Sequence, residues 1–323
     1  MYLPSLLVMT KESDTFLSLD SKDRCDDKHF IYILQVQSYV RILGVESMST
    51  NNTEISLKGS ALLLANAFDY EKTQLAEAIP NQQSKYTLSV IIPVYNEESK
   101  INSVLSHIKD VLGETQLDYE LIVINDGSTD KTELVIKEQE KLDKRVRVLS
   151  YNQNKGKGHA VKMGILSSKG DVVSFLDGDL NISPHEIKNY VKELEGCDLV
   201  IASKSHPLSI ISAPRIRKML SKMFSILVRL AVGIPIKDTQ SGLKVGNGAA
   251  LRKIFNVMLV KRYAFDVEML AIASKLNLKI KESPINITLD GSFNIREIFK
   301  MFIDVLGISY RLRIIHFYQK KWG

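Results

Sequence analysis

The sequence predicts an α/β fold in which a mostly parallel sheet is flanked by helices. From Tyr86 onward, short β-branched apolar runs alternate with longer segments whose apolar residues recur at helical spacing. Apolar strands that alternate with amphipathic helices are typical of a parallel sheet covered on both faces. Apolar residues make up 45% of the 323-residue chain and charged residues 25%, which is the composition of a globular protein with a sizeable core.

The first elements of this alternation follow from residue type and spacing. Tyr86–Val94 is predicted as a strand because its centre is a β-branched apolar run. Glu97–Leu112 is predicted as a helix because Ile101, Val104 and Ile108 fall on one face. By the same criteria the next strands are expected at Tyr119–Asn125, Val146–Ser150, Val172–Leu176 and Leu199–Ala202. The helices between them are expected from about Asp130, with Ser128 or Thr129 as cap, at His159–Ser168 and at Pro184–Leu194.

The second half of the chain is predicted to be more helical. Ile216–Val232 is amphipathic and basic, and Ile295–Lys320 has the pattern of one long helix that ends in basic residues. Two further helices are expected at Ala249–Met258 and Phe265–Leu276. Between these and the last helix, Lys279–Thr288 fits a strand pair or an edge segment.

The chain is expected to divide into three regions. Residues 1–85 form an extension of unknown role without a chemical motif, 86–245 form the core that carries the motifs, and 246–323 supply C-terminal amphipathic helices. Cys25 and Cys197 lie far apart, with no second Cys or His at ligand spacing. Neither a disulfide framework nor a zinc site is therefore predicted, and a reducing, cytoplasmic setting fits.

Basic residues are concentrated in one part of the sequence. The net charge is +6, and the segment Leu199–Lys237 contains no acidic residue but seven basic ones. They are Lys204, Arg215, Arg217, Lys218, Lys222, Arg229 and Lys237. Such a segment can face nucleic acid, anionic lipid or a phosphorylated substrate, or it can be solvated surface. The chain has no stretch of about 18 uncharged apolar residues, so no transmembrane helix is predicted.

Asp177-Gly178-Asp179 is the most informative motif, because it directly follows the apolar strand Val172–Leu176. Alternation along an extended chain points Asp177 and Asp179 the same way, with only a glycine between them. Two hard oxygen ligands at one strand end suit Mg²⁺ or Mn²⁺, which keeps its other positions for water and substrate phosphates. A lone Asp-x-Asp is often only a turn, so its position after two further strand-end motifs gives it weight.

Those two motifs follow the first and second strands. In Pro93-Val94-Tyr95-Asn96-Glu97, Pro93 ends the strand ladder, Tyr95 offers a flat face to a base, and Glu97 offers a carboxylate to a ribose hydroxyl. In Asn125-Asp126-Gly127-Ser128-Thr129-Asp130, Asp126 can accept a hydrogen bond from the imide of uracil or from guanine. The structural alternatives are a strand-to-helix turn for the first motif and an Asx turn for the second.

Three later motifs complete the set. Asn154-Lys155-Gly156-Lys157-Gly158 precedes a helix, so its open backbone amides and Lys155 or Lys157 suit an anion, and Lys155 is the candidate contact. Asp238-Thr239-Gln240-Ser241-Gly242-Leu243-Lys244 follows the basic segment. Phe265-Asp266-Val267-Glu268 opens a predicted helix, where its two acids are also compatible with simple helix stabilisation.

In this order the motifs closely resemble those of the family-2 inverting glycosyltransferases of the nucleotide-sugar-binding (GT-A) fold. Within that family the sequence looks most like the dolichyl-phosphate β-glucosyltransferases, with the dolichyl-phosphate mannosyltransferases next. The resemblance extends from about Leu88 to Arg313. Asn154–Gly158, Asp238–Lys244 and Phe265–Glu268 are the pieces most like the glucosyltransferases.

The resemblance implies a role for each matching residue. It implies that Pro93, Tyr95, Glu97 and Asp126 hold the nucleoside, and that Asp177 and Asp179 bind the diphosphate through Mg²⁺ or Mn²⁺. Asn181 takes the place of a polar residue that can complete the metal shell, and Asp179 is expected to be essential for catalysis. Asp238 resembles a residue near the acceptor, where it would act as base or orienter. Lys204, Arg215 and Arg217 are the candidates for the lipid phosphate from their charge and position.

The expected reaction is the transfer of a hexose, with glucose from UDP-glucose favoured, to a dolichyl or polyprenyl phosphate with inversion. Ile216–Val232 and Ile295–Lys320 are expected to lie on the cytoplasmic face of a membrane, apolar sides down, or else to pack in the core or a dimer. A mannosyltransferase that uses GDP-mannose and a non-catalytic nucleotide-binding protein are the alternatives. Nucleic-acid binding is not predicted, because three acidic motifs at strand ends would repel phosphates without a metal.

The sequence departs from the glucosyltransferase pattern at three places. Asp177-Gly178-Asp179-Leu180 stands where Asp-Ala-Asp-Gly is usual, and Ser203-Lys204 stands where Ser-Arg is usual. Lysine keeps the charge but loses bidentate phosphate recognition. Ser241 replaces a common cysteine. These differences bear on the donor sugar and the lipid more than on the type of reaction.

Overall fold

The computed structural model describes residues 7–8, 17–18, 87–178, 181–289 and 295–320. The chain separates into two compact units, Met1–Lys72 and Thr73–Gly323. In the first unit, β1 (Leu7–Val8) and β2 (Leu17–Ser18) pair antiparallel. Most of the expected extension at 1–85 lies outside the described residues.

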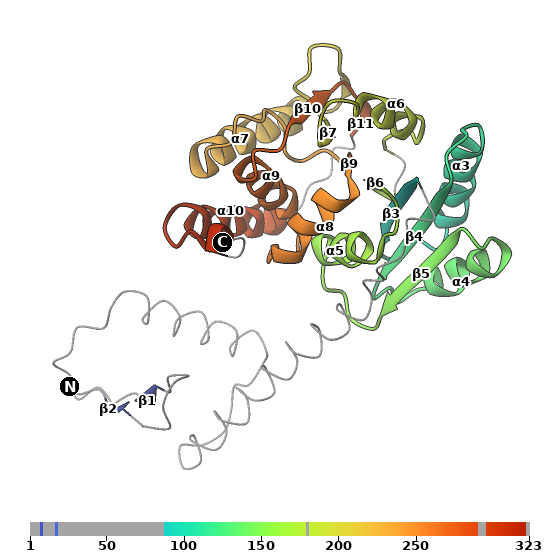
Figure 1. Cartoon of the computed structure of the whole chain (residues 1–323), viewed down its shortest axis with the longest axis horizontal. Helices are drawn as coiled ribbons and strands as arrows, with labels where there is room; N and C mark the ends of the chain where they lie inside the picture. Colours follow the sequence, from blue (N-terminus) through green and yellow to red (C-terminus); the bar gives the residue numbers. More distant parts are fainter. Residues whose placement is uncertain (1–6, 9–16, 19–86, 179–180, 290–294, 321–323) are drawn as a thin grey trace. The chain divides into compact units, whose positions relative to one another are not determined.

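A seven-stranded sheet forms the centre of the second unit, with the strand order β10-β7-β9-β6-β3-β4-β5 (Figure 1). All of its pairings are parallel except those of β9, which runs antiparallel between β6 and β7. The strands are β3 (Leu88–Val94), β4 (Tyr119–Asp126), β5 (Val146–Tyr151), β6 (Val172–Leu176), β7 (Leu199–Ala202), β9 (Leu243–Asn247) and β10 (Ile280–Ser283). The predicted mostly parallel α/β sheet is confirmed, and β9 is a strand that the sequence analysis did not predict. It runs through the boundary expected between residues 245 and 246.

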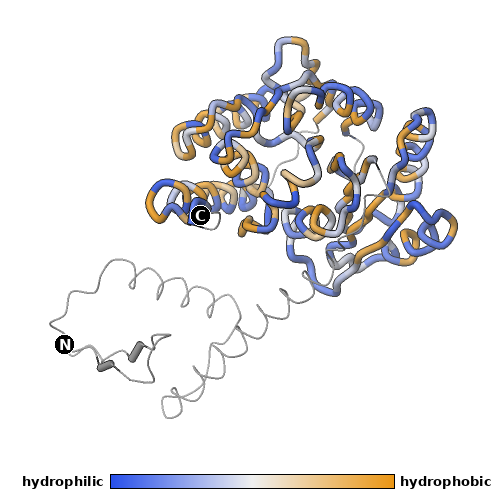
Figure 2. The backbone as a smooth tube through the Cα atoms, viewed as in Figure 1, coloured by the Kyte–Doolittle hydropathy of each residue, from blue (hydrophilic) through white to orange (hydrophobic). Residues whose placement is uncertain are grey.

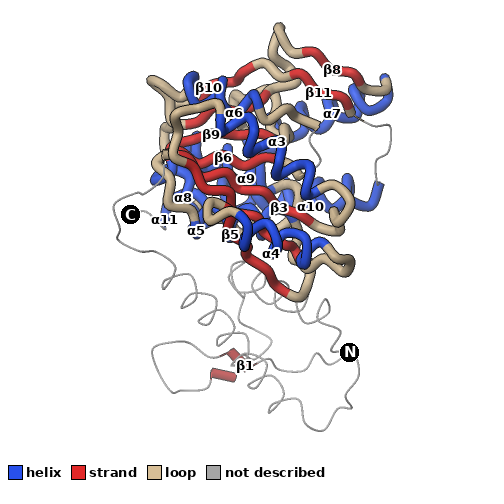
Figure 3. The backbone as a smooth tube through the Cα atoms, turned by 90° about the vertical axis from the view of Figure 1, so that its right-hand side faces the viewer, coloured by secondary structure: helices blue, strands red, loops and turns tan. Residues whose placement is uncertain are grey.

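Helices cover both faces of this sheet. One face carries α3 (Ile101–Gly113), α4 (Thr132–Leu142) and α6 (His185–Glu193), the side seen in Figure 3. The other face carries α5 (Lys157–Ser167), α8 (Gly248–Val257) and α9 (Phe265–Lys275). Residues of β3 alternate between the two cores: Val90 and Ile92 pack on the first side and Ile91 on the second. Burial on both faces explains why the strands are continuous apolar runs.

The acid-free segment and the C-terminus form a second group of elements. α7 (Arg215–Val232) packs beside α10 (Ile295–Arg313), and a short α11 (Phe317–Lys320) follows. Apolar and polar residues alternate along α7 and α10 in Figure 2. None of the described helices combines the length and apolar character that a bilayer-spanning segment needs.

Two C-terminal predictions need correction. The expected long helix Ile295–Lys320 ends at Arg313, because the chain turns there and His316 adopts a left-handed φ of 48°. In the Lys279–Thr288 segment the strand-pair alternative is wrong, because its two strands do not pair with each other: β11 (Asn286–Thr288) pairs with β8 (Ile210–Ser212). The edge alternative is confirmed, since β10 is the parallel edge strand beside β7. Both partners lie far away in sequence, which local patterns do not reveal.

Two helix starts also differ from the prediction. α3 begins at Ile101 rather than Glu97, because the preceding residues are held by hydrogen bonds to the loop after β4. Neither Ser128 nor Thr129 caps α4. The N-cap residue is Lys131, whose side chain makes no capping bond, and the Asp130 carboxylate just before it accepts from the backbone N–H of Thr132 at 3.0 Å.

Candidate functional site

The carboxyl ends of β3, β4 and β6 lie together at one edge of the sheet, since these strands are parallel neighbours. The three predicted strand-end motifs therefore meet at this edge, which we call the strand-end rim. Ligands of open α/β sheets bind beyond this edge. The sequence-predicted residues at the rim are Pro93, Tyr95, Glu97, Asp126 and Asp177.

The first two motifs are joined by reciprocal hydrogen bonds. The backbone N–H of Asn96 donates to Ser128 Oγ at 3.0 Å, and that of Thr129 donates to Asn96 Oδ1 at 2.8 Å. The backbone N–H of Glu97 donates to Thr132 Oγ1 at 2.8 Å. With the backbone fixed in this way, the ring of Tyr95 remains 46% exposed at the rim. The loops after β3 and β4 thus form one preorganised surface.

Asp126 connects this surface to the third motif. Its buried carboxylate accepts from the Tyr151 hydroxyl at 2.7 Å, from the backbone N–H of Lys155 at 2.8 Å and from that of Gly156 at 3.0 Å. Burial and then the bond to Asp126 raise the pKa of the Tyr151 hydroxyl, which keeps it a proton donor. A Cβ on Gly127 would lie 2.5 Å from the backbone N of Asn154, so only glycine allows the two loops to touch.

The two lysines of this third motif lie in different places. The ammonium of Lys155 lies 5.4 Å from the centre of the Tyr151 ring. Lys157, which opens α5, forms an ion pair with Oδ1 of Asp177. The sequence analysis considered both lysines for an anion and chose Lys155 as the candidate contact, because loop spacing does not tell which side chain turns toward the next strand.

Asp177 differs from Asp126 in how its oxygens are used. Oδ1 of Asp177 is buried and accepts no hydrogen bond in the described part of the chain, although it faces the Lys157 ammonium. On the other oxygen, an added Cβ at Gly242 would lie only 2.4 Å from Oδ2. Gly242 thus brings the Asp238–Lys244 motif against this carboxylate.

The remaining members of the expected metal set are Asp179 and Asn181. Asp179 lies outside the described residues, and Asn181 is exposed just beyond it. Among the described residues, no three His, Cys, Asp or Glu side chains gather as a group that could hold a metal ion. Of the predicted metal-binding pair Asp177 and Asp179, the structure therefore describes Asp177.

Asp238 is buried and fully engaged. Its carboxylate pairs with the Lys204 ammonium at 3.0 Å and accepts from the backbone N–H groups of Lys204 at 2.7 Å and Gln240 at 3.1 Å. Burial alone would raise the pKa of Asp238, but the Lys204 charge and these hydrogen bonds lower it overall. The two residues predicted for the acceptor side, Lys204 and Asp238, are thus brought into direct contact.

A second buried pair was missed by the sequence analysis. Lys244, which is fully buried in β9, pairs with Asp266 at 2.7 Å and donates to the Ser241 backbone carbonyl at 2.6 Å. Burial lowers the pKa of Lys244 and raises that of Asp266, and their mutual attraction opposes both shifts. The available signal was a lysine between two apolar residues, Leu243 and Val245, because a lysine buried there requires an acidic partner.

The other acid of the Phe265–Glu268 motif belongs to a separate cluster, which we call the C-terminal clamp: Glu268, Arg311 and Tyr318. Glu268 Oε1 accepts from the Tyr318 hydroxyl and from the Arg311 guanidinium at 3.1 Å. Its Oε2 accepts from the backbone N–H groups of Leu259 and Val260 at 3.0 and 2.7 Å. Glu268 therefore fastens α10 and α11 to the loop before α9.

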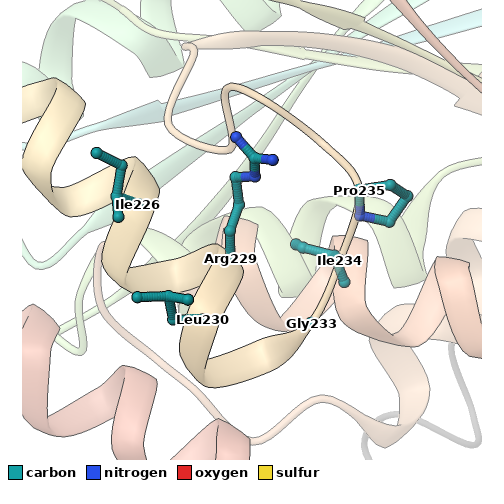
Figure 4. Close-up of a pocket in the computed structure, with 6 residues that line it drawn as sticks. All are labelled: Ile226, Arg229, Leu230, Gly233, Ile234 and Pro235. Atoms are coloured by element: carbon teal, nitrogen blue, oxygen red, sulfur yellow. The ribbon is translucent and has the colours of Figure 1, made fainter.

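α7 carries the other two predicted phosphate contacts. Arg215 is exposed at its first position and Arg217 is half-buried. Along the same helix, large apolar residues are exposed at a spacing of three and four, which we call the α7 stripe: Ile216, Met219, Met223, Ile226 and Leu230. At its end lies a cavity of about 460 Å³ lined by α7 and the loop after it, including Arg229 and Pro235 (Figure 4).

Comparison with known proteins agrees with this architecture. The family model described as "Glycosyl transferase family 2" matches residues 89–255. The dolichyl-phosphate beta-glucosyltransferase of Dictyostelium discoideum is 37% identical over 224 residues, which cover 64% of this chain and 68% of that protein. The human protein of the same name is 32% identical over 222 residues, with the same coverage of 64% and 68%.

Solved structures share the fold. The glucosyl-3-phosphoglycerate synthase of Mycobacterium tuberculosis, in complex with Mn²⁺, UDP and phosphoglyceric acid, aligns with a TM-score of 0.54 and 24% identity. The alignment covers 74% of this chain and 81% of that one. The residues matched by the family model, 89–255, contain the rim motifs and the sheet apart from β10 and the first residue of β3. This chain therefore belongs to glycosyl transferase family 2 and is a glycosyltransferase with the GT-A fold.

Proposed function

We propose that this enzyme transfers glucose from UDP-glucose to a dolichyl or polyprenyl phosphate, with inversion at the anomeric carbon. The observation that carries the proposal is the Asp177 carboxylate, paired with the Lys157 ammonium, beside the joined loops after β3 and β4. Relatives named dolichyl-phosphate beta-glucosyltransferase, at 37% and 36% identity in Dictyostelium discoideum and Drosophila melanogaster, support glucose and this lipid class.

The nucleoside would lie on the rim surface. Pro93, Tyr95 and Glu97 supply a stiff turn, an exposed ring and a carboxylate. Among the described residues, Oδ2 of Asp126 accepts one bond, from Gly156, so it can accept a further donor such as a base imide. Lys155 is held near Tyr151, where its charge can face the nucleotide.

A divalent cation fits at Asp177. Its side chain is 29% exposed, so an ion can reach it, and Gly242 lies so close to Oδ2 that any larger residue there would displace the carboxylate. Carboxylate oxygens suit Mg²⁺ and Mn²⁺, and Asp177, Asp179 and Asn181 would hold the ion. Structures with this fold contain Mn²⁺ or Mg²⁺ together with UDP. When bound, the ion stabilises the negative charge that develops on the departing diphosphate.

The acceptor needs alignment more than activation. A phosphate monoester carries about −1.5 to −2 charges near neutral pH, so its oxygen is already a nucleophile. Lys204, Arg215 and Arg217 would attract and orient it, as their charge and location suggest. Asp238 keeps Lys204 in place through their ion pair of 3.0 Å, which favours the role of orienter over that of base.

The lipid acceptor places the enzyme at a membrane. The α7 stripe exposes Leu230 to 73% and Met223 to 59%, and Phe299 on α10 is exposed to 65%. Lys218 and Lys222 flank the stripe on the same helix. An apolar helix face bordered by basic residues binds the surface of anionic bilayers. We therefore place the enzyme peripherally on the cytoplasmic face, with residues 86–245 holding the donor and 246–323 on the acceptor side.

A donor panel tests this function. Purified full-length enzyme is incubated with dolichyl phosphate, Mg²⁺ and radiolabelled UDP-glucose, UDP-galactose or GDP-mannose. We expect label to enter the lipid phase only from UDP-glucose, and EDTA to stop the transfer. Label from GDP-mannose alone would establish the mannosyltransferase alternative, and nucleotide binding without any transfer would establish a non-catalytic protein.

A further inference from the structure

Lys157 lies at a helix N-terminus, where a positive charge is unfavourable. It is the first residue of α5, and the first turn of that helix contains no acidic residue. A cation at a helix N-terminus is unfavourable because the helix dipole places partial positive charge there. The compensating charge comes from another strand end, since the Lys157 ammonium pairs with Asp177 Oδ1. The location of Lys157 is therefore explained by the rim and not by the helix.

The neighbouring charged residues do not replace Lys157 as the partner of Asp177. The other cation of the cluster, Lys244, is already engaged by Asp266 at 2.7 Å and by the Ser241 carbonyl. Asp266 lies near enough to Lys157 and Asp177 for both charges to act on it. With side chains 21% and 29% exposed, Lys157 and Asp177 are shielded enough to attract each other and open enough to separate.

We propose that Lys157 is an internal counter-cation. Its ammonium binds the Asp177 carboxylate in place of the divalent ion until the sugar nucleotide arrives. This inference rests on the metal site of the proposed function. The ammonium and the metal compete for Asp177, so the ion alone binds weakly. A diphosphate group that arrives with the metal offers the displaced ammonium a new anionic partner. Metal and nucleotide therefore bind as a coupled pair, and the coupling depends on the charge of Lys157.

Binding of Mn²⁺ to full-length protein, followed by electron paramagnetic resonance without and with UDP, tests this coupling. In Lys157→Met, we expect Mn²⁺ alone to bind at least about fivefold more tightly than in wild type, the lower end of ordinary coupling between sites. The factor by which UDP improves Mn²⁺ binding should fall by a similar amount. Lys157→Arg keeps the charge and should behave as wild type.

Lys141→Met is the matched control, because that lysine is exposed in the last turn of α4 and lies outside the rim motifs. It should leave the binding of Mn²⁺ alone unchanged. Equal Mn²⁺ affinity in wild type and in Lys157→Met, with folding confirmed by thermal melting, would overturn the proposal. Asp177→Asn tests the metal site separately from the role of Lys157. If Mn²⁺ still binds to Asp177→Asn, Asp177 is not a metal ligand and the proposed metal site is wrong.

Discussion

The strand-end rim and the C-terminal clamp both bury carboxylates, but they use them differently. In the clamp, both oxygens of Glu268 accept hydrogen bonds, from Arg311 and Tyr318 on one side and from two backbone amides on the other. At the rim, Asp177 keeps an oxygen without a hydrogen bond, among the described residues, and faces a lysine. A buried acid whose oxygens all accept hydrogen bonds stabilises a fold, whereas one held by a partly exposed ion pair can exchange that partner for a ligand.

The same contrast exists within the rim. Asp126 is held by Tyr151 and two backbone amides, so it organises the loop that it contacts. Among the described residues, Asp177 accepts no backbone hydrogen bond that would organise a loop, and Gly242 lies close against its second oxygen. The sequence motifs do not distinguish the roles of Asp126 and Asp177. The groups that each carboxylate contacts in the structure do.

The largest expected effect is the loss of transfer when the metal carboxylates are removed. Asp177→Asn and Asp179→Ala should each lower the transfer rate by at least about 10³-fold, or roughly 4 kcal/mol of transition-state stabilisation. The melting temperature should stay close to that of wild type, because the acid at 177 makes few structural hydrogen bonds. Radiolabel transfer and thermal melting measure the two quantities.

Asp171→Asn is the control, since Asp171 is an exposed acid at the opposite end of β6 and should keep full activity. Wild-type turnover in Asp179→Ala with Mg²⁺ would contradict the assignment of that residue.

A change in the clamp should have the opposite result: it should lower the stability of the fold and leave ligand binding unchanged. Glu268→Gln leaves the Arg311 charge buried without its partner, which costs about 3–5 kcal/mol in the free energy of unfolding. Urea denaturation should report this loss, while the affinity of the remaining folded protein for UDP stays unchanged. Glu297→Gln breaks an exposed ion pair with Lys300 on α10 and should cost less than about 1 kcal/mol. Equal costs for the two variants would show that the clamp does not fasten the helix.

The sequence predicts the strands at the rim well, because they are buried on both faces and read as uninterrupted apolar runs. Strands β6 and β7 have the predicted bounds. It does not predict β9, since Lys244 and Gly246 interrupt the apolar pattern and the pairing with β6 and β7 is non-local. A buried lysine in a strand is intelligible only once Asp266 is known to lie beside it.

The same limit applies to the site. The carboxylates at the strand ends were predicted because parallel strands bring their ends together. Which lysine faces Asp177 was not predicted, because α5 turns Lys157 toward β6 while Lys155 stays in the loop.

A smaller effect is expected from closing the space beside Asp177. A Cβ at Gly242 would lie 2.4 Å from Oδ2, so Gly242→Ala must displace the carboxylate. Disturbing the support of a metal ligand typically weakens metal affinity by about 10–100-fold. Titration of Mn²⁺ in the presence of UDP measures this change. Gly113→Ala in α3 meets no atom within 4 Å and should leave the affinity unchanged.

The smallest expected effect concerns the membrane surface, where each charge contributes independently. Lys222 is exposed on α7 beside the α7 stripe, and a basic residue near an anionic bilayer contributes about 1 kcal/mol. Lys222→Gln should therefore weaken binding to phosphatidylserine vesicles by about fivefold in a co-sedimentation assay. Lys141→Gln, an exposed change on α4 at the other side of the unit, should have no effect. Equal losses in both variants would mean that net charge, and not the α7 surface, directs the enzyme to the bilayer.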